Sequence, residues 1–207
     1  RSHRKSPGTR HVKYCYFDFH NEDDYSDEDN DEVIHPGPIP HWEMLARILR
    51  HMGQNVTLVI DDERLRSVEE VQPFARAISG HPSITSLQDN GRFPYESLDT
   101  LFSTLATLPA LESATLRAPE VTQADESTLA HPESLTELFR VPSLRSVFFH
   151  EYLKPTLCQA IASALMEGTA VTNLEFSRCS LSDGECAAVM ANGLAKNRSV
   201  MSITVEQ

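Results

Sequence analysis

The sequence predicts an α/β solenoid preceded by a disordered tail. Three observations support this fold class. A short apolar pattern typical of a β-strand recurs about every 28 residues between residues 55 and 207. Apolar residues at helical spacing lie between these strand patterns. Residues 1–39 have a composition that cannot bury enough apolar surface to offset the entropy of the chain.

The clearest strand pattern is Val171-x-x-Leu174-x-Phe176-x-x-Cys179-x-Leu181. We call the residue at the position of Leu174 the anchor of its unit. The six anchors are Leu58, Leu87, Ala114, Val147, Leu174 and Ile203. Successive anchors are 29, 27, 33, 27 and 29 residues apart, so the unit that precedes Val147 carries an insertion. Stacking such units buries apolar faces that no unit could bury alone.

Two further positions of each unit are expected to point into the core with the anchor. Three residues before the anchors stand Asn55, Ile84, Leu111, Leu144, Val171 and Val200, and two residues after them stand Ile60, Asp89, Leu116, Phe149, Phe176 and Val205. Each buried Leu, Ile or Phe contributes about 1.5–3 kcal/mol. Asn55, Asp89 and Ala114 depart from the pattern, so the first three units are defined less clearly than the last three.

Helices are predicted between the strand patterns. Apolar residues recur at steps of three and four in Val71, Phe74 and Ile78, in Leu98, Leu101, Phe102 and Leu105, in Leu157, Ile161 and Leu165, and in Cys186, Val189, Met190 and Leu194. Gly80 and Gly168 stand where helix C-caps are expected. Each unit therefore consists of a strand followed by a helix.

These units resemble leucine-rich repeats of the ribonuclease-inhibitor subclass. The resemblance is strongest from Leu181 to Val200, where a Leu and a turn with Asp-Gly precede an alanine-rich helix and Asn-Arg-Ser-Val. It implies a horseshoe over residues 55–207, with about five to six repeats, a parallel sheet on the concave side and helices outside. The family consists mostly of protein-binding modules. At the last strand pattern we expect either further repeats beyond the C-terminus or an edge that pairs with another chain.

The N-terminal region divides into a tail and a helix. Residues 1–13 carry five basic residues and no acid, whereas residues 14–39 carry nine acids and no Lys or Arg, and end in a proline-rich linker. We predict that 1–39 is disordered. Residues 40–54 are predicted to form a capping helix, because Trp42, Leu45, Ile48, Leu49 and Met52 lie on one helical face. Ser26, followed by three acids, is a candidate phosphorylation site.

Composition excludes several classes of function. A net charge of −12 argues against a nucleic-acid partner, and no run of 18 apolar residues predicts a membrane span. The four cysteines form no disulfide or metal-ligand spacing, which favours a reducing compartment, cytoplasmic or nuclear. The acidic run lacks the glycine of a calcium loop, because Glu28 stands sixth from Asp23. We expect no catalytic, cofactor-binding or metal site.

The concave face is the candidate binding surface. Strand alternation directs residues beside the anchors away from the core. The partner-binding candidates are Arg117, Phe148, His150, Glu151, Glu175 and Arg178. An exposed aromatic ring beside arginines has the composition of a binding hot spot. The alternative is a one-residue slip within Val147-Phe148-Phe149, which would exchange Phe148 and Phe149 between the two faces.

The predicted function is a non-enzymatic protein-interaction module that binds a protein partner on the concave face of the solenoid. The alternative is a regulatory subunit, either an activator of a small GTPase or a substrate receptor of a ubiquitin ligase. A third hypothesis places the interaction in the charged tail.

Overall fold

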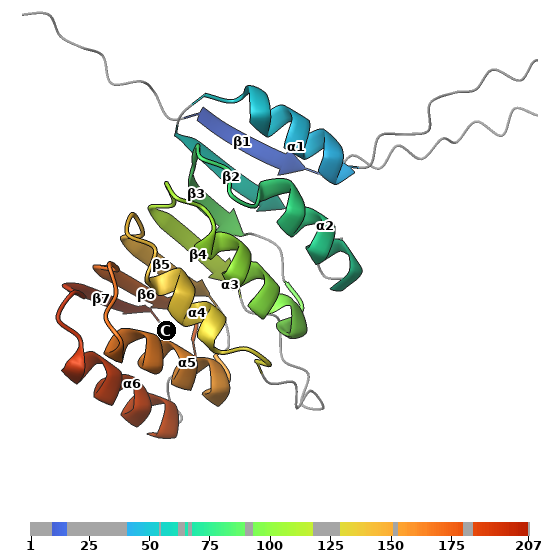
Figure 1. The fold of residues 1–207 in the computed structure, drawn as a ribbon. Helices are drawn as coiled ribbons and strands as arrows, with labels where there is room; N and C mark the ends of the chain where they lie inside the picture. The colour runs from blue at the N-terminus through green and yellow to red at the C-terminus, as the bar shows by residue number, and fades with distance from the viewer. Residues whose placement is uncertain are drawn as a thin grey trace, which may run out of the picture.

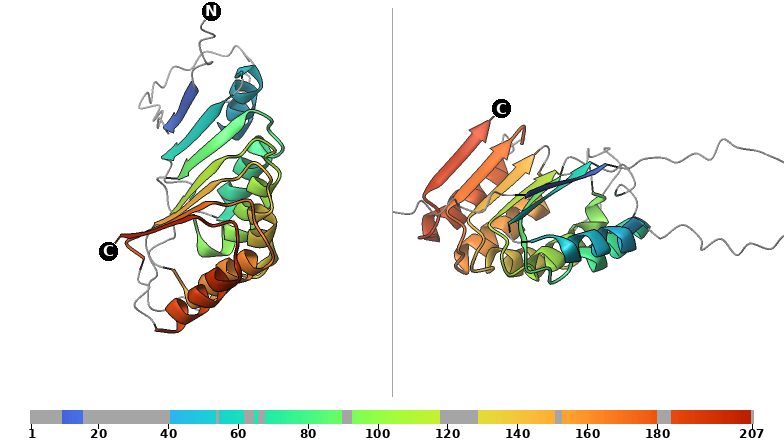
Figure 2. Two further views of the ribbon diagram at one scale, coloured as in Figure 1. Left: turned by 90° about the vertical axis from the view of Figure 1, so that its left-hand side faces the viewer. Right: turned by 90° about the horizontal axis from the view of Figure 1, so that it is seen from above.

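The computed structural model describes residues 10–15, 41–53, 55–61, 65, 68–89, 93–117, 129–150, 153–179 and 184–206. Over these residues the chain forms one seven-stranded sheet in which the strands follow chain order and every neighbouring pair is parallel. The helices lie on one face of the sheet, and the opposite face, which we call the open face, carries no described helix (Figures 1 and 2). This arrangement is a solenoid-like α/β fold.

Strands and helices alternate along the chain. The strands are β1 (Arg10–Cys15), β2 (Val56–Asp61), β3 (Ile84–Asp89), β4 (Ser113–Arg117), β5 (Ser146–His150), β6 (Asn173–Ser177) and β7 (Ser202–Glu206). The helices are α1 (His41–His51), α2 (Val68–Ile78), α3 (Leu98–Ala106), α4 (Glu133–Phe139), α5 (Pro155–Met166) and α6 (Gly184–Lys196), and a 3₁₀ turn, η2 (Tyr95–Ser97), precedes α3. Each strand from β1 to β6 is therefore followed by a helix before the next strand begins.

The predicted strand register is confirmed. The six anchors Leu58, Leu87, Ala114, Val147, Leu174 and Ile203 are aligned across the sheet. The first five anchors are buried between the sheet and the helices, with exposed fractions of 2% or less. In β5, Phe149 is buried and Phe148 is half-buried, so the one-residue slip is excluded.

The prediction of a disordered tail is wrong for Arg10–Cys15. These residues form β1, which pairs in parallel with all of β2. Val12 and Tyr14 take the register positions of Leu58 and Ile60. The alternation of apolar and polar residues from His11 to Tyr14 favours a strand at a sheet edge, but the average composition of the tail conceals so short a segment. The rest of the predicted tail, with Ser26, lies outside the described residues.

The predicted capping helix is α1, although its buried face is narrower than the sequence indicates. Trp42, Leu45 and Leu49 are buried, whereas Ile48 is 42% exposed. Trp42 donates a hydrogen bond from Nε1 to the carboxylate of Glu70, and its ring meets that of Phe74 edge-on at 5.4 Å. Helix α1 thus packs on α2, while β1 forms the edge of the sheet.

At the start of β2 one predicted inward residue is corrected. The residue in register with Ile84 is Val56, not Asn55, and an irregularity in the pairing separates Val56 from Thr57. Val56 is fully buried. Asn55 has a φ of 63°, in the left-handed region that Asn tolerates better than most residues. A bulge therefore moves the apolar residue one position along the chain.

The last strand has no cover on its helix-facing side among the described residues. Ile203 and Val205 are 45% and 49% exposed, although their register partners Leu174 and Phe176 are buried.

None of the helices in the described ranges is long and apolar enough to cross a membrane.

Candidate functional site

Two rows of side-chain positions cross the open face of the sheet. From β4 to β7 the first row is Thr115, Phe148, Glu175 and Thr204, and the second is Arg117, His150, Ser177 and Glu206. Neighbouring strands of a sheet are about 4.8 Å apart, so consecutive members of a row are adjacent. We call the four half-buried residues Arg117, Phe148, His150 and Glu175 the β4–β6 patch.

The burial of Val147 and Phe149 determines the face on which Phe148 lies. Val147 and Phe149 are both buried, and the ring of Phe149 stacks on that of Phe176 with 5.7 Å between centroids. Because side chains alternate along a strand, Phe148 is directed to the open face. Thr115 and Glu175 are its register partners on either side. The Phe148 side chain is half-buried.

Small polar residues occupy the open face where the strands begin. The hydroxyl of Ser113 donates a hydrogen bond of 2.7 Å to that of Ser86. Asn173 donates a bond of 3.2 Å from Nδ2 to the hydroxyl of Ser146. These bonds cross neighbouring strands and satisfy the polar atoms without tall side chains. The part of the open face near the start of the strands therefore carries small polar side chains.

The structure brings four of the six predicted binding residues together. Arg117, Phe148, His150 and Glu175 lie on three consecutive strands. Arg178 follows the end of β6 and has a φ of 55°, so strand alternation does not assign it to a face. Its backbone N–H donates a hydrogen bond of 2.8 Å to the carbonyl of Glu206. Glu151 lies outside the described residues.

The β4–β6 patch combines one apolar ring with a guanidinium, an imidazole and a carboxylate. This set can bury an apolar group and hydrogen-bond polar groups of either charge. Within the described residues, no group of three His, Cys, Asp or Glu side chains is placed to hold a metal ion. The patch therefore offers both apolar and polar contacts to a ligand.

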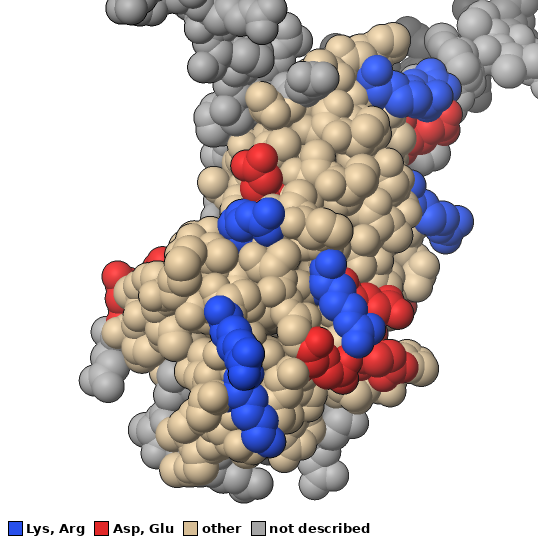
Figure 3. All heavy atoms as spheres, turned by 60° about the vertical axis from the view of Figure 1, so that its left-hand side comes forward, with Lys and Arg blue, Asp and Glu red and all other residues tan. Residues whose placement is uncertain are grey.

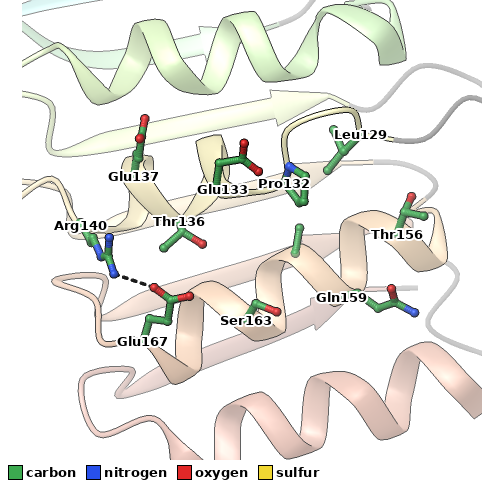
Figure 4. Close-up of a pocket in the computed structure, with 11 residues that line it drawn as sticks. Leu129, Pro132, Glu133, Thr136, Glu137, Arg140, Thr156, Gln159, Ser163 and Glu167 are labelled. Atoms are coloured by element: carbon green, nitrogen blue, oxygen red, sulfur yellow. Dashed lines mark hydrogen bonds and ion pairs between the residues drawn. The ribbon is translucent and has the colours of Figure 1, made fainter.

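Besides the β4–β6 patch, a hollow lies between α4 and α5 on the helix side. It has a volume of about 470 Å³ and is lined by Leu129, Pro132, Glu133, Thr136, Glu137, Arg140, Thr156, Gln159, Ala160, Ser163 and Glu167 (Figure 4). Arg140 and Glu167 form an ion pair of 2.6 Å across it, and both side chains are about half exposed. Sequence reasoning missed this hollow, because most of its residues are polar side chains from two helices and follow no motif. Its charges are already paired or solvated, which makes it a weaker candidate than the open face.

A buried lysine is the other feature that sequence reasoning missed. Lys154 is only 8% exposed, and its Nζ lies 4.4 Å from the centre of the Tyr95 ring. The Tyr95 hydroxyl is 2.9 Å from Thr156 Oγ1, and burial raises the pKa of this phenol. These contacts join the turn before α3 to the start of α5, so they link two units that are separated by the β4–α4 unit.

The side on which the strands begin shows mixed charge. Lys and Arg side chains lie beside Asp and Glu side chains at several places, and most of the described surface in this view is uncharged (Figure 3). Among the described residues of that side, no single-sign field marks a site for a polyanion or a polycation.

Comparisons with family models, with curated proteins and with solved structures find no match to this chain.

Proposed function

We propose that this protein is a non-enzymatic interaction module, a leucine-rich-repeat solenoid of the ribonuclease-inhibitor subclass that binds a protein partner through the β4–β6 patch. The observation that carries the proposal is the position of Phe148. Its side chain lies on the open face, between Thr115 and Glu175, with Arg117 and His150 in the next row. Aromatic residues and arginines contribute most to the binding energy of protein interfaces.

The surroundings of Phe148 support a protein ligand. An apolar ring with polar residues around it has the anatomy of an interface core and rim. The rows continue across β4, β5 and β6 at the same level, so an elongated partner surface can contact them together. Stacked units build extended surfaces of this kind. The resemblance of residues 181–200 to the ribonuclease-inhibitor subclass points to the same use.

The test is capture of partners from native extract with the full chain and two single variants. Phe148→Asp places a charge at the centre of the patch. Thr204→Asp is the matched control, because Thr204 occupies the same row on β7 and is exposed. Each captured protein is purified and its Kd measured against all three chains. The proposal predicts that Phe148→Asp weakens binding at least tenfold and that Thr204→Asp changes it less than twofold.

Equal melting temperatures of the three chains would show that the loss of binding arises at the substituted position and not from unfolding. Retained affinity in a folded Phe148→Asp variant contradicts the proposal. A captured small GTPase whose turnover rises with the protein would support the regulatory alternative. A captured component of a ubiquitin ligase would support a substrate receptor.

A further inference from the structure

The hollow between α4 and α5 arises because α4 is short. Helix α4 has seven residues and begins 14 residues before the anchor Val147, whereas α5 has twelve and begins 19 residues before the anchor Leu174. Both helices end eight residues before their anchors. Relative to α5, α4 therefore lacks more than one turn at its N-terminal end. Thr156, Gln159 and Ala160, in the first half of α5, line the hollow that this leaves.

The hollow carries an excess of negative charge. The carboxylates of Glu133, Glu137 and Glu167 line it together with one guanidinium, that of Arg140. Arg140 pairs with Glu167 at one end of the hollow (Figure 4). Glu133 contacts the imidazole of His131 at 3.1 Å, and Glu137 has no side-chain partner among the described residues. Two carboxylates of α4 are therefore left without a Lys or Arg partner in the described part of the chain.

A buried threonine opens into the same hollow. Thr136 is 7% exposed, and its hydroxyl lies in the space between α4 and α5 (Figure 4). Among the described residues, none forms a hydrogen bond with this hydroxyl. Thr104 of α3 is buried to the same extent, but its hydroxyl donates to the carbonyl of Thr100 at 2.7 Å. Because most buried polar side-chain atoms are hydrogen-bonded, the Thr136 hydroxyl indicates a place for a ligand atom.

The end of the hollow away from the ion pair is apolar. Leu129 and Pro132 lie there, and Leu129 is 8% exposed (Figure 4). A ligand that matches both ends has an aliphatic stem and a cationic head. Lysine has this chemistry, with a four-carbon stem and an ammonium that donates three hydrogen bonds. The volume of about 470 Å³ lies within the range of about 300–1,000 Å³ of ligand pockets, so there is room for a lysine and its neighbours in a peptide.

We propose that the α4–α5 hollow is a second binding site, which takes a lysine side chain from a short segment of a partner protein. The stem of the lysine lies along Leu129 and Pro132. Its ammonium donates to the Thr136 hydroxyl, and Glu133 and Glu137 balance its charge. The hollow is on the helix side of the sheet, whereas the β4–β6 patch is on the open face, so this site is independent of the proposed function.

The lysine nearest the start of the chain is too close to β1 to be the occupant. Lys5 stands five residues before Arg10, which allows about 17 Å of extended chain. Helices α4 and α5 flank β5, four strands from β1, which is about 19 Å across the sheet. The helix layer adds to this distance. A lysine from another protein is therefore the better match.

The test uses a phage-displayed library of random short peptides, selected on the full chain. Recovered peptides are synthesised, and their Kd values are measured. We expect a class of peptides that carry a lysine. Replacing that lysine by norleucine, which keeps the stem and removes the charge, should raise Kd about fivefold or more.

Substitutions in the full chain locate the site. Glu137→Gln and Thr136→Val should each raise the Kd of the lysine peptide about threefold or more, because each removes a group that the ammonium contacts. The Kd of the norleucine peptide should change less than about twofold with either. Glu112→Gln removes an exposed carboxylate outside the hollow and is the control, with an expected change of less than about twofold. Thr136→Val keeps the shape of the side chain, so the melting temperature should move by less than about 2 °C.

Three results would overturn the proposal. One is a selection that yields no lysine peptide weakened by both Glu137→Gln and Thr136→Val. Another is a set of lysine peptides that lose affinity in Phe148→Asp and keep it in Glu137→Gln, which would place them on the β4–β6 patch and support the proposed function instead. The third is a gain in affinity of about fivefold or more in Lys5→Gln, which would identify the chain's own lysine as the occupant.

Discussion

The ring of Phe149 lies nearly parallel to that of Phe176, with an interplanar angle of 10° and 5.7 Å between centroids. The two residues are register partners on β5 and β6, and both are buried. This contact fixes which of the consecutive residues Val147, Phe148 and Phe149 enter the core. It therefore decides that Phe148 is the aromatic residue of the open face.

Truncation of the two neighbouring phenylalanines should have unequal effects on stability. Phe149→Ala removes a buried ring and is expected to lower the free energy of unfolding by about 3–5 kcal/mol. Phe148→Ala removes a half-buried ring and should cost less than half as much. Urea denaturation of both variants measures the difference. Equal losses, or a greater loss for Phe148→Ala, would show that the register is wrong.

A charge at the anchor of β6 should prevent folding. Leu174 is 2% exposed between the sheet and the helices, and Leu174→Asp would leave a carboxylate there with no compensating cation. We expect loss of the cooperative thermal transition in circular dichroism. Glu175→Asp, one residue along the strand, is the control and should melt as the parent does. An unchanged transition in Leu174→Asp would refute the proposed core.

Gly193 is expected to resist substitution by alanine, although alanine favours helices by about 1 kcal/mol. The added Cβ would meet backbone atoms of Ala162 at 2.8 and 2.9 Å, so α5 and α6 must separate. Gly193→Ala should therefore lower the free energy of unfolding by about 1–3 kcal/mol. Gly184→Ala is the control, since nothing lies within 4 Å of its Cβ position. A stabilised Gly193→Ala variant would contradict the close contact.

The thiol of Cys179 should make stability depend on alkaline pH. Burial raises the pKa of Cys179 to about 12, although a hydrogen bond with the Ser177 backbone acts in the opposite direction. The unfolded thiol loses its proton near its ordinary pKa of about 8.5, while the folded thiol keeps it. The folded state then binds more protons, so this contribution to stability is present below about pH 8.5 and is lost as the pH rises toward about 12.

The comparison variant for this pH dependence is Cys179→Ala. Subtracting its melting temperatures from those of the parent removes the titration of Tyr and Lys residues, which both chains share. The difference should fall as pH rises above about 8.5. A difference that is constant with pH would show that Cys179 titrates normally in the folded protein.

The turn between α6 and β7 depends on one asparagine. Asn197 accepts hydrogen bonds through Oδ1 from the backbone N–H groups of Ser199 and Val200, at 2.9 and 2.7 Å. Its Nδ2 donates to the carbonyl of Leu165 on α5, at 2.8 Å. Asn197→Ala should lower the free energy of unfolding by about 1–3 kcal/mol, because these groups lose their partner. Asn197→Asp keeps the two accepted bonds and should recover part of the loss in urea denaturation.

Much of the fold could be predicted from the sequence because its signal is periodic. The spacing of the anchors placed β2 to β7 in their observed register, and the apolar stripes between them predicted helices. A strand with one buried face must place an apolar residue at every second position, and stacked units repeat that demand. The same alternation brought Arg117, Phe148, His150 and Glu175 to one face.

The sequence failed where the decisive contact is not periodic. The pairing of Arg10–Cys15 with β2 joins segments 46 residues apart, and six residues carry too weak a pattern to show it. The bulge at the start of β2 brings Val56, and not Asn55, into register with Ile84. Counting residues from the anchor cannot detect such a one-residue shift. Ile48 matches the apolar stripe of α1 but is 42% exposed, because α1 packs on its neighbours over a narrower face.

The sequence by itself determined the strand–helix unit, the order of the strands from β2 to β7 and, outside β5, the residues of the open face, because local alternation and a nearly regular repeat length encode all three. Only the tertiary structure decided that β1 forms one edge of the sheet, which aromatic ring of β5 is buried, and that Ile203 and Val205 of β7 are exposed. These depend on contacts between units, whose energy belongs to pairs of residues far apart in the chain.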